Sequence, residues 1–128
     1  MNYYIAKTVS GAFEDVIERV TAALKEEGFG VIAEIDVRDT LKEKLDVDFR
    51  PYRTLGACNP HFAHEALQTE PAVGTLLPCN VVVEESTPGV CEVKAINPEV
   101  AMQAIPNDKL ATIASRVTER LNRVLANI

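Results

Sequence analysis

The hydrophobic and polar positions along the chain alternate between two periods, one typical of helices and one typical of strands. Apolar residues at steps of three and four mark one face of a helix, whereas strict alternation marks a strand that is covered on one side. The first helical stripe consists of Phe13, Val16, Ile17, Val20 and Leu24. This stripe predicts a helix that ends at Gly28, a residue type that commonly terminates helices.

Nine elements follow from these patterns, in the order β-α-β-α-β-α-β-β-α. The strands are expected at Tyr3–Val9, Phe29–Val37, Tyr52–Ala57, Cys79–Glu85 and Val90–Ile96. The helices are expected between Ser10 and Gly28, and at Arg38–Leu45, Pro60–Thr69 and Lys109–Ile128. The turn residues at 86–89 predict that the last two strands form an antiparallel hairpin. The simplest packing is an α+β two-layer sandwich, in which helices cover a mainly antiparallel sheet.

Two local details of this arrangement can be predicted as well. Ser10 precedes the first helix and is a suitable residue to cap it. In the second strand, alternation places Val31, Ala33, Ile35 and Val37 on one side of the sheet. This alternation predicts a strand that is paired antiparallel or lies in a sheet crossed by helices.

The size and composition of the chain fit one globular domain over residues 1–128. Of these 128 residues, 47% are apolar and 25% are charged, which are ordinary values for a globular protein. A chain of this size buries enough surface to fold without a metal or a disulfide. If the protein binds a metal or uses a reactive thiol, it does not need either of them in order to fold.

Charge and cysteine content exclude several classes of function. The net charge is −6, from 19 acidic and 13 basic residues, and the basic residues are scattered, so we expect no nucleic-acid binding. No apolar run approaches the roughly 20 residues of a membrane span, so we expect no membrane insertion. The N-terminus does not resemble a signal peptide, and three cysteines, an odd number, suggest free thiols. We expect a cytoplasmic protein.

The residues most suited to chemistry are two cysteines at element boundaries. Cys58 ends the third strand, directly before Asn59 and Pro60, which suit the N-cap and first position of a helix. A thiol there faces the positive end of the helix dipole, which favours thiolate. Cys79 opens the fourth strand after Pro78. The alternative is that each cysteine is a small buried side chain that fills a corner of the core.

Two histidines extend this region toward a possible metal site. Cys58, His61 and His64 follow one another at three-residue steps, a spacing that can converge on one ion. However, paired histidines on a polar helix face are more often solvated, and the chain has no second cluster of ligands. Cys91 alternates with Val93 and Ala95, so we expect it in the core.

The remaining sequence contains no further motif for catalysis. The six glycines are separate and form no phosphate-binding loop, and no nucleophile elbow or triad is present. Gly56 and Gly74 are better interpreted as points where the backbone approaches another segment closely. We therefore expect a binding module rather than an enzyme, with no particular cofactor indicated.

The two cysteine-centred blocks are similar to the signature of domain of unknown function family 302. The matching segments are Tyr52–Pro60, Ala63, Ala66-Leu67, Glu70-Pro71, Gly74 and Leu76–Val83, with Gly28–Val31, Glu34–Val37 and Leu41–Leu45 upstream. The resemblance extends from the first helix to Asn97-Pro98. It implies a compact α+β domain that forms a homodimer, and it implies that Cys58 and Cys79 belong to the family pattern. It implies further that His61, His64 and Cys91 are individual to this chain.

Three hypotheses follow for the function. The first is a homodimeric binding module with a small-molecule or metal site near Cys58 and Cys79. The second is a thiol-dependent redox protein that uses the same two cysteines, and the third is a purely structural role. The candidate ligand-binding residues are Cys58, Asn59, Pro60, Cys79 and Asn80, and the candidate metal ligands are Cys58, His61 and Cys79.

Overall fold

Residues 2–128 are described by the computed structural model, and they contain the predicted elements in the predicted order. The strands are β1 (Tyr4–Ser10), β2 (Gly30–Asp36), β3 (Tyr52–Cys58), β4 (Cys79–Thr87) and β5 (Val90–Ile96). The helices are α1 (Phe13–Glu26), α2 (Val37–Leu45), α3 (Pro60–Thr69), α4 (Pro98–Ala101) and α5 (Asp108–Ala126), with a 3-10 helix η1 (Pro71–Leu76). Only the short segments η1 and α4 add to the nine predicted elements.

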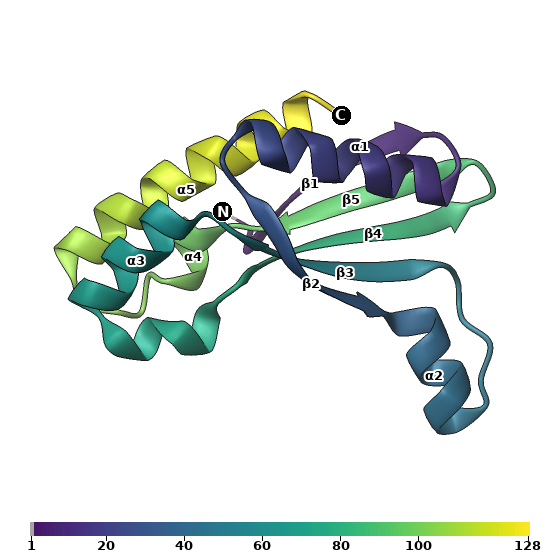
Figure 1. Cartoon of the computed structure of the whole chain (residues 1–128), viewed down its shortest axis with the longest axis horizontal. Coiled ribbons are helices and arrows are strands. Elements are labelled where there is room, and N and C mark those ends of the chain that lie inside the picture. Colours follow the sequence, from purple (N-terminus) through teal and green to yellow (C-terminus); the bar gives the residue numbers. More distant parts are fainter. Residues whose placement is uncertain (1) are drawn as a thin grey trace.

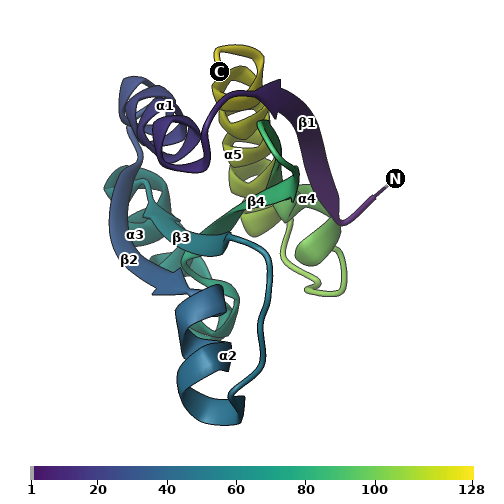
Figure 2. The same cartoon turned by 90° about the vertical axis from the view of Figure 1, so that its right-hand side faces the viewer.

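All five strands form one antiparallel sheet in the order β1-β5-β4-β3-β2. Helices α1 and α5 lie side by side over one face of this sheet, whereas α2 projects away from the body of the domain (Figure 1). A view turned by 90° shows the helix layer on one side of the strands (Figure 2). The predicted α+β two-layer sandwich is therefore confirmed.

The core lies between the sheet and the helix layer. Alternate residues of β4 and β5 point into it, and the apolar stripes of α1 and α5 cover them. The fully buried side chains include Val16, Val20, Leu24, Leu55, Val81, Val83, Val93, Leu121 and Val124. Cys91 is also fully buried, which confirms its predicted place in the core. Within residues 2–128, no helix has both the length and the apolar character that crossing a membrane requires.

The other face of the sheet holds an ionic cluster around Glu84. This carboxylate is only 9% exposed, and it accepts hydrogen bonds from Lys94 Nζ at 3.1 Å and from Arg50 Nη2 at 3.1 Å. Burial alone would raise the pKa of Glu84, but the hydrogen bonds and charges of Lys94 and Arg50 outweigh it and lower the pKa. The cluster is therefore stabilised in its charged form.

Two local predictions were wrong. Helix α1 begins at Phe13 with Ala12 at its N-cap, and no side chain caps it. Gly11 has a φ of 147° and turns the chain there, so Ser10 stays within β1.

The second error concerns β2, where a register shift between Val31 and Ala33 marks a bulge. Val31 pairs with Ala57 and Ala33 pairs with Gly56, which are adjacent residues of β3. Adjacent residues point to opposite faces, so Val31 and Ala33 do not share one face as predicted. Ile32, the extra residue, is left outside the regular pairing.

Candidate functional site

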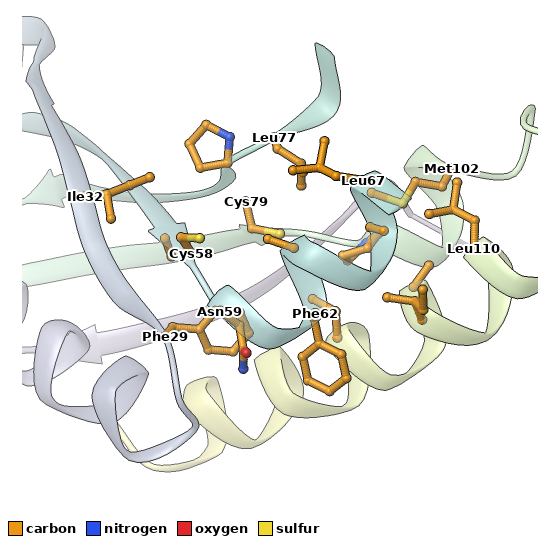
Figure 3. Close-up of a pocket in the computed structure, with 18 residues that line it drawn as sticks. Phe29, Ile32, Cys58, Asn59, Phe62, Leu67, Leu77, Cys79, Met102 and Leu110 are labelled. Atoms are coloured by element: carbon orange, nitrogen blue, oxygen red, sulfur yellow. The ribbon is translucent and has the colours of Figure 1, made fainter. Parts of the chain in front are cut away.

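The β3–β4 junction brings Cys58 and Cys79 into the same region. Ala57 of β3 pairs directly with Cys79 of β4, so Cys58 is one residue away from the partner of Cys79. Both side chains line one pocket (Figure 3), and Cys58 is near enough to affect the Cys79 thiol electrostatically. The sequence predicted both thiols at element boundaries, and these boundaries meet at one pocket.

The pocket has a volume of about 250 Å³ and lies between α3, α4, α5 and the ends of three strands. Its lining residues are Phe29, Ile32, Ala57, Cys58, Asn59, Phe62, Ala63, Ala66, Leu67, Leu77, Pro78, Cys79, Pro98, Met102, Leu110, Ile113, Ala114 and Val117. Leu110, 1% exposed, is among its buried residues, whereas Ile32 and Leu67 are 65% and 42% exposed. The pocket is therefore lined by buried apolar residues in one part and by exposed apolar residues in another.

The lining of this pocket is almost entirely apolar. Among the described residues, none that lines it carries a charged side chain. The side-chain heteroatoms in the lining belong to Cys58, Cys79, Asn59 and the thioether of Met102. This chemistry favours an apolar ligand and leaves the two thiols as the strongest nucleophiles of the lining.

Asn59 occupies the predicted N-cap position of α3, but its side chain does not cap the helix. Instead Nδ2 donates a hydrogen bond to the carbonyl oxygen of Glu27 at 3.3 Å, and Arg120 Nη1 donates to the same oxygen at 3.1 Å. Gly28, with a φ of 85°, passes so close that an added Cβ would lie 3.0 Å from Asn59 Nδ2. Asn59 therefore connects the pocket, through this hydrogen bond, to the C-terminal end of α1.

The two thiols of the pocket have different environments. Cys79 is 8% exposed, and burial together with the nearby Cys58 raises the pKa of its thiol to about 11. Cys58 is half-buried. Cys91 belongs elsewhere, because it pairs with Glu85 at the far end of the β4–β5 hairpin and its thiol donates to the carbonyl oxygen of Gly11 at 3.8 Å. Both pocket cysteines are free thiols.

The other predicted site residues do not line the pocket. Pro60 and Asn80 are exposed and lie outside the lining, as do His61 and His64 on the outer side of α3. Within residues 2–128, no group of three or more His, Cys, Asp or Glu side chains is arranged to hold a metal ion. The geometry thus brings together Cys58, Asn59 and Cys79 from the candidate set.

Of the two glycines predicted to mark close backbone approach, one does so. A Cβ at Gly56 would lie 2.9 Å from Pro78 Cγ, and Pro78 lines the pocket. A Cβ at Gly74 would meet only Leu67 Cδ2, at an ordinary 3.7 Å. The prediction was right for Gly56 and wrong for Gly74.

Sequence reasoning missed the contributions of Ile32 and Met102 to the pocket. Ile32 lies at the β2 bulge, and Met102 follows α4, an element that the sequence did not predict. A usable signal was present in α3, where Phe62, Ala63, Ala66 and Leu67 recur at the spacing of one helical face. Of that face only Ala66 is fully buried, because much of the rest borders the pocket.

Comparisons with known proteins agree with the resemblance seen in the sequence. The model of the family described as domain of unknown function DUF302 matches residues 5–128. The crystal structure of an uncharacterized conserved DUF302 protein from Bacillus stearothermophilus is similar to this chain, with 31% identity and a TM-score of 0.92. The match covers 99% of this chain and 98% of that one. A comparison with curated proteins finds no match. The chain therefore belongs to the DUF302 family.

Proposed function

We propose that this domain is a binding module that holds a small apolar molecule in the pocket beside Cys58 and Cys79. The observation that carries the proposal is a hollow of about 250 Å³ whose lining includes both thiols and no charged side chain. An apolar cavity of about 150 Å³ is large enough to bind benzene. The present pocket therefore has room for a molecule of one or two rings, or for a short branched chain.

The form of the pocket supports binding rather than a purely structural role for these segments. Exposed apolar side chains at Ile32 and Leu67 cost free energy in water, and a bound apolar molecule would cover them. Buried residues such as Phe29 and Leu110 would contact the inner part of the same ligand. Burial of apolar surface on both sides of the ligand is the main source of the expected affinity.

The lining offers less support for the redox and metal alternatives. A thiol whose pKa is raised to about 11, as in Cys79, is protonated at neutral pH, and thiol–disulfide exchange and metal ligation both need thiolate. His61 is exposed on α3 and lies outside the pocket that contains Cys58 and Cys79. A neutral apolar ligand requires none of these groups to lose a proton.

The homodimer implied by the family resemblance is part of the same proposal. Outside the pocket, large apolar side chains are exposed on β2 and on the segment that contains α2, and they are Ile35, Leu45 and Val47. A second copy that covers this region would remove that surface from water. Light scattering during size-exclusion chromatography gives the mass directly. A monomer mass at all concentrations up to the millimolar range would contradict the dimer.

Binding can be tested with toluene, indole and naphthalene as probes in a two-dimensional NMR titration. We expect saturable shift changes at the amides of Cys58, Phe62 and Leu110. The variant Ala63→Leu adds bulk at a half-buried position of the lining and should weaken binding at least tenfold. Ala22→Leu, at an exposed position of α1 outside the lining, is the matched control and should bind as the wild type does.

Two results would reject the binding proposal. One is the absence of saturable shifts with any of the three probes. The other is equal affinity of the wild type and the Ala63→Leu variant, because the probe would then occupy some other site. Thermal denaturation of both alanine variants shows whether either substitution disturbs folding.

A further inference from the structure

The pocket contains nucleophiles but no side chain that could act as a general acid or base in the usual pH range. No His, Asp, Glu or Lys is part of its lining among the described residues. Hydrolysis and acid–base chemistry therefore have no support here. The remaining reactivity is that of a cysteine, whose thiolate form adds to soft electrophiles.

The two thiols differ in a way that suggests separate tasks. Cys79 is more than nine-tenths buried, lines the pocket, and has no hydrogen-bond partner within the described part of the chain. Cys58 lies beside it and is more exposed. The S–H group of Cys79 is a weak donor, and it remains available to an acceptor on a ligand in the pocket. The more accessible thiol is the one that can reach a ligand's reactive carbon.

We propose that the pocket captures apolar α,β-unsaturated carbonyl compounds, with Cys58 as the point of covalent attachment and Cys79 as a hydrogen-bond donor to the carbonyl oxygen. This inference rests on the proposed function, because the apolar part of the compound occupies the same pocket. It adds a ligand class and a modification site to that function.

The addition is balanced without any further reactant. The Cys58 sulfur forms a bond to the β carbon while the carbon–carbon π bond breaks, and the electron pair moves toward the carbonyl oxygen as an enolate. Cys58 reacts as the thiolate after its proton has passed to water, and a proton from water then adds to the α carbon, which gives a saturated thioether. Nothing is oxidised or reduced and no group leaves.

Two features of the site assist this step. The raised pKa of Cys79, about 11, keeps its S–H available as a donor at neutral pH. Helix α3 begins two residues after Cys58, and the side chain of Asn59 does not cap its first N–H groups. These N–H groups and the helix dipole favour negative charge as it develops on the enolate.

The proposal can be tested with phenyl vinyl ketone and methyl vinyl ketone, which share a reactive group and differ in apolar bulk. The rate of adduct formation is followed by intact-protein mass spectrometry and divided by the rate for glutathione with the same ketone. We expect the normalised rate to be at least tenfold higher for phenyl vinyl ketone. Peptide mapping should place the adduct on Cys58.

Variants separate the parts of the proposal. Cys58→Ser should form no adduct, and Ala63→Leu should lower the normalised rate for phenyl vinyl ketone to that for methyl vinyl ketone. Cys79→Ala should keep the adduct on Cys58 but slow its formation severalfold. Ala22→Leu should react as the wild type does. The folded state of each variant is checked by the position of its thermal transition.

Equal normalised rates for the two ketones, or equal labelling of Cys58 and the buried Cys91, would overturn the inference. The noncovalent titration distinguishes this failure from that of the proposed function. If toluene still saturates the pocket in Cys58→Ser and the wild type, apolar binding stands and only covalent capture is rejected. If toluene does not bind either, both proposals fail.

Discussion

Replacement of Gly56 by alanine tests the close packing between β3 and the pocket. The added Cβ would lie 2.9 Å from Pro78 Cγ and 3.3 Å from Ala33 Cβ, and the former is shorter than real Cβ contacts allow. Inserting an atom into such a closely packed place destabilises the folded state by about 1–3 kcal/mol. Alanine restricts the unfolded chain more than glycine does, and this stabilises the folded state by about 0.4–1 kcal/mol. The net expectation is a loss of about 0.5–2 kcal/mol in the free energy of unfolding.

This loss is measured by urea denaturation followed by circular dichroism. For a domain of this size it corresponds to a fall in Tm of roughly 2–8 °C. Gly30→Ala is the matched control, because it lies in the neighbouring strand β2 and a Cβ there would have no neighbour within 4 Å. That variant should be as stable as the wild type or slightly more stable. Equal stability of the Gly56→Ala and Gly30→Ala variants would show that the contact with Pro78 does not limit packing at Gly56.

Three further predictions concern the ionic cluster around Glu84, the buried pocket residue Leu110 and the three thiols. The pKa of Glu84 in the folded protein is lowered from about 4.5, so its contribution to stability is complete above that pH and is lost as the pH falls through the folded pKa. Glu84→Gln should therefore destabilise the protein at pH 7 and differ less from the wild type at pH 3, as measured by urea denaturation midpoints. A difference that stays constant with pH would contradict this. Leu110→Ala should lower the free energy of unfolding by about 2–5 kcal/mol and enlarge the pocket. A loss below about 1 kcal/mol in the same denaturation experiment would show that Leu110 is less closely packed. In the native protein, iodoacetamide should label Cys58 well before Cys79 or Cys91, and equal rates would argue against their different burial.

Most of the fold could be predicted because its elements have strong local patterns. The stripe of α5 and the alternation of β5 follow from residues close together in the sequence, and their faces agree with the structure. Errors arose where one residue changed the geometry. Gly11 turned the chain before α1, and the extra residue Ile32 reversed the faces of β2.

The site could be predicted only in part, because a pocket depends on contacts between distant segments. Cys58 and Cys79 were identified from their positions at strand ends, and the β3–β4 register brings them together. The side chain of Asn59 has its partner 32 residues away at Glu27, which no local rule for helix capping includes. The apolar lining contributed by Met102 likewise follows from the packing of α4, not from any motif.

Crystallography under xenon pressure can show whether an accessible apolar pocket lies beside the two thiols. Xenon enters cavities that are apolar and not filled by side chains. The account predicts xenon density between Cys58, Phe62 and Leu110 in the wild type, and none there in the Ala63→Leu variant. Side chains that fill this space, with no xenon beside the thiols of the wild type, would contradict it.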